Sequence, residues 1–198
     1  MLNELKNSFL IASPVMTDER FAKTVILLLE HRAEGSFGLV LNKEGEFSLS
    51  EACEQLECPP PKRDIAFGWG GPVHPMMAFV LHTTQGQWLR TDFENPKTGI
   101  ALTVSDDILR AAAEGKGPDK IYPVLGCAMW DAGQLEAEIR EGAWFCAQSS
   151  PRIVFDLTCS PRYVRLRLPW SAMRHSETNT FLFPMKSVMR DNRKASVR

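Results

Sequence analysis

The chain has 198 residues, of which 44% are apolar, and its 23 Lys and Arg against 24 Asp and Glu leave a formal net charge of −1. A chain of this length buries roughly 70% of the surface that its unfolded form exposes, so it can sustain one ordinary core. The balanced charge excludes a uniformly basic nucleic-acid coat protein and a highly charged disordered chain, and 13 Gly and 13 Pro exclude collagen-like and low-complexity architectures.

Strand patterns dominate the first part of the chain. A short apolar run at residues 9–12 ends at Ser13-Pro14, and the run at 24–30 is continuous, which is typical of a strand covered on both faces. Residues 37–42 form a further apolar run after a turn at 31–36. Because this connection is too short for a crossover helix, we expect the two longer strands to be antiparallel neighbours.

Two helices are predicted in the first third of the chain. Thr17 is placed to cap a brief helix whose first turn holds Asp18. The clearer helix spans 48–56, where Ser48 and Glu51 fit a capping box. Its apolar residues recur at helical spacing on one face: Leu49, Ala52, Cys53 and Leu56.

The rest of the chain alternates between strands and helices. Strand patterns occur at 64–69, 78–83, 87–92, 99–103, 122–128, 144–147 and 152–157. Helices are predicted over 105–114 and 131–141, the second with Asp131 as its N-cap. Closely connected strands mixed with separated helices indicate an α+β fold, with a mixed, mostly antiparallel sheet flanked by helices.

The charge is unevenly distributed along the chain. From Arg174 onward six basic residues face two acidic ones, a net of +4, which leaves −5 for residues 1–173. We therefore expect a single domain over 1–173 and a basic, poorly ordered tail over 174–198. Such a tail either contacts RNA, DNA or another acidic surface, or is a solvated terminus.

Cysteine usage and the N-terminal residues favour a cytoplasmic protein. Five cysteines are present, and the apolar run at 9–12 is too short for a signal peptide. No stretch approaches the ~18 apolar residues of a membrane span. We expect reduced thiols, with Cys53 as a small core residue. No metal-binding spacing occurs, so neither a metal nor a cofactor is predicted.

The common catalytic motifs are missing. The sequence has no Gly-x-Ser-x-Gly elbow, no phosphate-binding loop and no Gly-x-Gly-x-x-Gly at a helix start. His31 follows one predicted strand and His82 ends another, so both could lie at one rim, where each would exchange a proton near neutral pH or bond a neighbouring loop. A small hydrolase-like enzyme using His82 or a cysteine is therefore the alternative to a binding protein.

Two segments have both a ligand-binding and a structural explanation. The amides of Gly68 to Gly71 could form an anion nest, or the glycines could serve a tight turn, which we favour. Trp130 directly precedes a predicted helix start, where anions bind, but the charge of Asp131 would repel a phosphate.

Three ordered motifs over residues 8–157 together resemble one known family. They are Ser13-Pro14-x-Met16-x-Asp18-x-x-Phe21 followed by Glu30-His31 and Gly38-Leu39-Val40-Leu41-Asn42; Gly70-Gly71-Pro72-Val73-x-Pro75 with Phe79-Val80-Leu81-His82; and Leu125-Gly126 with Trp130-x-Ala132-Gly133-Gln134-Leu135-Glu136-x-Glu138-Ile139. This set resembles the AlgH/YqgE family, although Met129 and Asp131 replace two of its glycines and Glu44 a proline. The resemblance implies a bacterial cytoplasmic α+β protein of unsettled activity, labelled as a transcriptional regulator.

The sequence favours a non-enzymatic binding or regulatory protein that acts through a protein or small-molecule partner. Direct DNA binding is disfavoured because the body is acidic and no basic recognition helix is evident. No catalytic residue is assigned. The candidate binding surface, expected where strand ends gather on one face, consists of Asp18, Asn42, Gly70, Gly71, Pro72, His82, Trp130 and Gln134.

Overall fold

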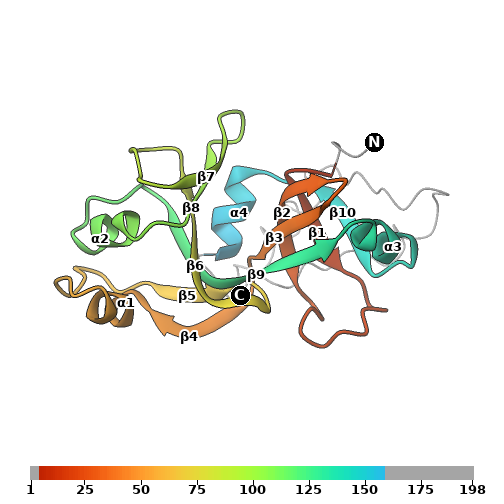
Figure 1. The fold of residues 1–198 in the computed structure, drawn as a ribbon, viewed down its shortest axis with the longest axis horizontal. Helices are drawn as coiled ribbons and strands as arrows, with labels where there is room; N and C mark the ends of the chain where they lie inside the picture. Colours follow the sequence, from red (N-terminus) through yellow and green to blue (C-terminus); the bar gives the residue numbers. More distant parts are fainter. Residues whose placement is uncertain (1–4, 159–198) are drawn as a thin grey trace, which may run out of the picture.

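The computed structural model describes residues 5–158, which form a curved sheet with four short helices (Figure 1). The elements in chain order are β1 (Ser8–Ala12), β2 (Val25–Arg32), β3 (Gly35–Val40), β4 (Glu44–Ser48), α1 (Leu49–Gln55), β5 (Ala66–Trp69), β6 (Val73–Thr83), β7 (Thr91–Asn95), β8 (Ile100–Thr103), α2 (Asp107–Ala113), β9 (Ile121–Asp131), α3 (Gln134–Arg140), β10 (Trp144–Gln148) and α4 (Pro151–Thr158).

The sheet is mixed but almost entirely antiparallel, as predicted. Its ten strands run in the order β10-β1-β2-β3-β9-β6-β8-β7, with β5 beside β9 and β4 beside β5. Among these pairings only that of β5 with β9 is parallel. β2 and β3 are the expected antiparallel neighbours. The helices have only seven or eight residues each, so they are a minor part of the fold.

β9 joins the two halves of the sheet. Its first half pairs with β6, from Ile121 opposite His82 onward, whereas its last four residues pair with β3, where Trp130 lies opposite Ser36. Figure 1 shows the consequence: α1 and α2 lie at one end of the molecule and α3 lies at the other. β9 therefore holds apart two regions that each have their own helices.

Both faces of the sheet are covered, which explains the continuous apolar run of β2. Side chains of successive strand residues point to opposite faces. Leu27 and Leu29 pack in a cluster with residues of β6, β8 and α4. Ile26 and Leu28 pack in a second cluster that contains Leu135 of α3. The prediction of a strand covered on both sides is confirmed.

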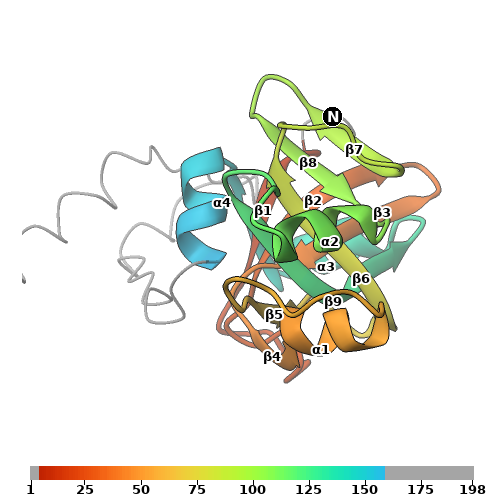
Figure 2. The same ribbon diagram turned by 90° about the vertical axis from the view of Figure 1, so that its left-hand side faces the viewer.

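A third apolar cluster lies beneath α1 and α2, which Figure 2 shows on the same side of the sheet. α1 starts as predicted, because the Glu51 amide donates to Ser48 Oγ at 3.4 Å and the Ser48 amide donates to the Glu51 carboxylate at 2.8 Å. This capping box orients the helix so that Leu49 and Cys53 are buried.

The largest error of the sequence-based assignment concerns residues 152–157, which form helix α4 and not a strand. The Ser150 carbonyl accepts from the Val154 amide at 3.0 Å, and its hydroxyl accepts from the Ile153 amide at 3.4 Å. Pro151, the first helical residue, has the backbone angle that a first turn needs. These start signals outweigh the strand propensity of Ile153 and Val154.

Three smaller predictions were also wrong. Asp131 ends β9 and does not cap α3, whose N-cap is Gly133 in the left-handed conformation at φ +76°. The brief helix expected after Thr17 is a single turn, whose bonds run from the Phe21 and Ala22 amides to the Asp18 carbonyl. The strand expected at 87–92 lies instead at β7.

The predicted boundary between residues 173 and 174, and the basic tail beyond it, lie outside the described residues. Within residues 5–158, no helix has both the length and the apolar character that crossing a membrane requires.

Candidate functional site

Several residues of the predicted surface lie beside the apolar cluster that contains Leu135 of α3, because Phe21, Val40, Trp69 and Trp130 belong to or pack against that cluster. Asn42 follows β3 and fastens the loop before β2, because its Oδ1 accepts from the Val25 amide at 2.7 Å and its Nδ2 donates to the Lys23 carbonyl at 2.9 Å. Asp18 lies in that same loop and binds the Arg20 guanidinium at 2.7 Å. That ion pair and hydrogen bond hold the pKa of the Asp18 carboxyl below its usual value.

A row of aromatic rings connects this loop to Trp130. The Phe21 ring lies 6.0 Å from Trp69 and 5.8 Å from Trp144, measured between centroids. Trp144 in turn lies 6.1 Å from Trp130 in an edge-on arrangement. Segments far apart in the sequence thus share one packed cluster.

Glu138 of α3 binds both of the buried indoles in this cluster. Its Oε2 accepts hydrogen bonds from Trp130 Nε1 at 2.9 Å and Trp144 Nε1 at 2.7 Å, and its Oε1 accepts from Gln134 Nε2 at 2.9 Å. Trp130 is 6% exposed and Trp144 1% exposed. The polar group of Trp130 is therefore used inside the protein, a role that the sequence analysis did not assign although Glu138 lies in its third motif.

The glycines of the second motif are explained by close backbone packing. A Cβ at Gly71 would lie 2.2 Å from the carbonyl of Cys127, and one at Gly70 would lie 2.2 Å from the carbonyl oxygen of Gly126. The Gly70 amide donates to Leu125 and its carbonyl accepts from Val40. The steric explanation for these glycines, which the sequence analysis favoured, accounts for them without an anion; Pro72, next to them, is half-buried.

His82 is not brought to this group. It pairs with Ile121, nine residues before Trp130 on β9, which places the two residues roughly 30 Å apart along the strand. His31 on β2 pairs with Ser36 on β3, and Ser36 pairs with Trp130 at the other end of β9. The two histidines therefore do not share a rim either. The expected single face is therefore wrong with respect to His82.

The surroundings of His82 give it a structural role. Its Nδ1 lies 2.8 Å from the Thr83 carbonyl, which only accepts, so Nδ1 carries the hydrogen, and Nε2 accepts from the Thr103 hydroxyl at 2.9 Å. The residue is 1% exposed. Burial lowers the pKa of His82, so the neutral ring is favoured.

The four cysteines within residues 5–158 are free. Burial raises the pKa of the Cys53, Cys127 and Cys146 thiols to about 11 in each case. Such thiols hold little thiolate at neutral pH and are poor nucleophiles. Within residues 5–158, no three His, Cys, Asp or Glu side chains lie close enough together to hold a metal ion.

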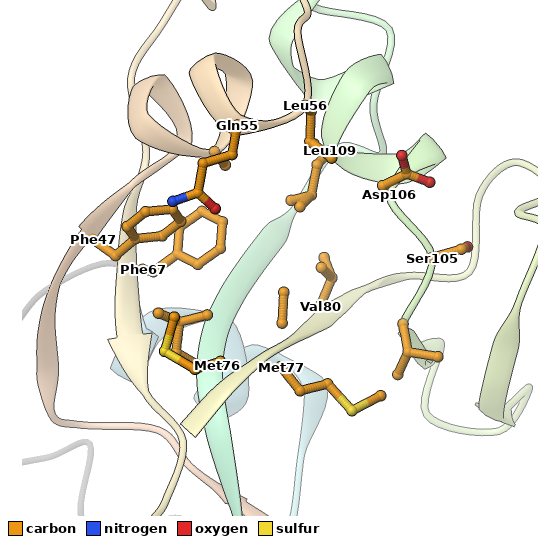
Figure 3. Close-up of a pocket in the computed structure, with 14 residues that line it drawn as sticks. Phe47, Gln55, Leu56, Phe67, Met76, Met77, Val80, Ser105, Asp106 and Leu109 are labelled. Carbon is orange, nitrogen blue, oxygen red and sulfur yellow. The ribbon is translucent and has the colours of Figure 1, made fainter. Parts of the chain in front are cut away.

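An apolar groove between α1 and α2 was missed by the sequence analysis. Its accessible volume is about 200 Å³. In Figure 3, Leu56 and Leu109 extend from the helix side toward Val80 on β6, and Met76 and Met77 lie at the far end of the groove. The other lining residues are Phe47, Ala52, Gln55, Phe67, Ala78, Val104, Ser105, Asp106 and Leu125.

The groove has one strongly exposed apolar side chain. Met76 is 85% exposed although it belongs to strand β6. The wall at the other side contains Phe47 and Phe67, whose rings meet edge-on at 5.2 Å. The adjacent methionines Met76 and Met77, after a glycine-proline turn, were the available sequence signal for this surface.

Comparison with known proteins agrees with the motifs. The family model described as AlgH-like matches residues 9–167. The chain is 44% identical to a UPF0301 protein of Pseudomonas syringae pv. tomato over 162 residues, 80% of this chain and 84% of that one. It is 41% identical to a UPF0301 protein of Chromobacterium violaceum over 80% of this chain and 86% of that one.

Two solved structures share the fold. The solution structure of the AlgH protein from Pseudomonas aeruginosa matches with a TM-score of 0.69 and 42% identity, covering 80% of this chain and 84% of that one. A crystal structure of a Corynebacterium diphtheriae protein matches with a TM-score of 0.57 and 26% identity, covering 74% and 77%. Sequence motifs, family model and fold thus agree, and the chain belongs to the AlgH-like family.

Proposed function

We propose that this chain is a non-enzymatic cytoplasmic binding protein that engages a protein partner through the α1–α2 groove, and that any regulatory role follows from this contact. The observation that carries the proposal is the apolar groove with Met76 exposed at its end. Exposed apolar surface that is contiguous, here Met76 together with the apolar groove, marks interaction sites in proteins.

The size of the groove favours a protein segment over a small molecule. Pockets that enclose a ligand usually have about 300–1,000 Å³, whereas this groove has about 200 Å³. It therefore accommodates one or two apolar side chains of a partner. Met76 and Met77 are suited to this task, because the flexible thioether chain adapts to differently shaped partners.

The catalytic alternative has less support. His82 is buried, and both of its ring nitrogens are bonded within the protein. The Cys53, Cys127 and Cys146 thiols are also buried, and the half-buried Cys58 does not line the groove. A general base or nucleophile must reach its substrate, and these groups do not open onto the groove.

Site-specific photocrosslinking tests the proposal. A photoreactive phenylalanine derivative is placed at position 76 in the full chain, and the matched control carries it at position 129. Met129 is also an exposed methionine, 50% accessible, but it lies on β9 away from the groove. We expect one protein to be captured in a bacterial lysate from position 76 and not from position 129.

Binding of the captured, purified partner is then measured against variants of the full chain. Burying a methionine contributes about 1.5–3 kcal/mol, so Met76→Glu is expected to weaken binding by about tenfold or more, and Met129→Glu to leave it unchanged. Equal crosslinking from both positions, or unchanged affinity of the Met76→Glu variant, would refute the proposal.

A further inference from the structure

Two cysteines lie side by side at the end of α1, although four residues separate them. Glu57 takes φ +53°, the Cys58 amide donates to the Cys53 carbonyl at 2.9 Å, and the Glu57 amide donates to the Glu54 carbonyl at 3.3 Å. These bonds define a Schellman motif, which typically brings the side chains at the positions of Cys53 and Cys58 into contact. Both side chains belong to the apolar cluster beneath the two helices.

The geometry of this helix end is compatible with a disulfide. With standard bond lengths, the direct backbone hydrogen bond limits the separation of the two Cα atoms to below about 7 Å, and disulfides usually span about 4.4–6.8 Å. Burial and, next, the neighbouring Cys58 thiol raise the pKa of Cys53 to about 11. The helix end therefore holds the two cysteines at a backbone separation that a disulfide can span.

The two thiols differ in access to solvent. Cys58 is half-buried and follows the helix, so a small oxidant can reach it. Cys53 is 1% exposed and lies behind it. The other described thiols are differently placed: Cys127 and Cys146 are both buried in strands, and Cys127 donates to the Val73 carbonyl at 3.5 Å.

We propose that Cys53 and Cys58 form an oxidation site, in which a peroxide converts the pair into a reversible intramolecular disulfide. Cys58 sulfur attacks the peroxide, so that an S–O bond forms, the O–O bond breaks and a first water leaves. Cys53 sulfur then attacks the Cys58 sulfenic acid, the S–S bond forms, and the hydroxyl group leaves with the Cys53 proton as a second water. Two thiols lose two electrons, which reduce one hydrogen peroxide to two waters.

Contact between the thiols offsets the low thiolate content of Cys53. Holding two reacting groups together raises their effective concentration far above that in solution. The closed loop contains Gln55 and Leu56, which line the groove, so the disulfide also ties down one groove wall. The oxidation itself does not depend on whether the groove binds a partner.

Peptide mapping of the full, reduced chain tests the proposal. The native protein is treated with hydrogen peroxide, alkylated with iodoacetamide in denaturant and digested with trypsin. Both cysteines fall in the one tryptic peptide 44–62, while Cys127 and Cys146 fall separately in peptides 121–140 and 141–152. We expect peptide 44–62 to lose two hydrogen atoms and both alkylation sites, and to regain both sites when dithiothreitol precedes alkylation.

The other peptides act as internal controls, and Cys58→Ser is the matched variant. In this variant the loss of two hydrogen atoms from peptide 44–62 should disappear, while Cys127 and Cys146 remain alkylated in both proteins. The proposal is overturned if Cys58 gains oxygen atoms while Cys53 stays alkylated, if Cys58 is linked to another peptide, or if Cys127 and Cys146 are oxidised as fast as the pair.

Discussion

Glu138 is predicted to fix α3 against the sheet through the two buried indoles. Glu138→Ala removes the acceptor at 2.9 Å from Trp130 Nε1 and 2.7 Å from Trp144 Nε1. An unsatisfied buried donor costs about 1–3 kcal/mol, so two of them should lower the free energy of unfolding by about 2–6 kcal/mol. This is a large share of the about 5–15 kcal/mol that stabilise a typical domain.

Two further variants separate the bonds of the buried indoles from those of the exposed Gln134 side chain. Glu138→Gln retains an acceptor oxygen for the indoles and should cost about 1 kcal/mol, because a neutral acceptor is weaker than a carboxylate. Gln134→Ala removes two bonds of an exposed side chain, the one that its Nε2 donates to Glu138 at 2.9 Å and the one that its Oε1 accepts from the Asp131 amide at 3.0 Å. It should cost about 1 kcal/mol.

Urea unfolding followed by far-ultraviolet circular dichroism measures all three variants, with the slope m as the check on two-state behaviour. The role of Glu138 is refuted if the free energy of unfolding of Glu138→Ala lies within about 1 kcal/mol of that of the unsubstituted chain, or if Glu138→Gln is as destabilising as Glu138→Ala.

Three more predictions follow from the structure and the charge distribution. The pKa of His82 is lowered by burial, so the unfolded chain binds a proton at this residue more readily than the folded chain does. The stability that is present above about pH 6.5 should therefore fall as the pH is lowered. Urea titrations at pH 7.5 and 5.5 should show a smaller pH dependence for His82→Gln, and an unchanged dependence would contradict this prediction. Gly71→Ala should lower the free energy of unfolding by more than about 2 kcal/mol, because its Cβ would meet the Cys127 carbonyl at 2.2 Å. Gly142→Ala, at φ +81° with open space around it, should lower it by only about 1 kcal/mol. Thermal melts of both variants test the difference. DNA binding should be weak, independent of sequence, lost as salt rises and absent from a chain truncated before Arg174; tight, selective binding by the truncated chain in gel shifts would refute this.

Local signals in the sequence determined much of the fold. The capping box at Ser48 and Glu51 uses contacts three residues apart, and the helix began where they placed it. The continuous apolar run at 24–30 identified a strand with two covered faces, and the short connection after it set the antiparallel pairing with β3. Local signals gave the wrong element where two of them conflicted. Residues 152–157 have strand propensity, but the helix-start signal before them determines the structure.

The arrangement of the candidate site was decided only by the tertiary structure. The spacing of His82 and Trp130 in the sequence does not show that His82 pairs with the first residue of β9 while Trp130 lies near the last. Strand register depends on pairing between distant segments. The same holds for the groove, which is lined by residues of α1, α2, β4, β5, β6 and β9 and of the segment between β8 and α2. Residue types and local order are properties of the sequence, whereas which side chains meet is fixed by long-range packing, which no short window of residues contains.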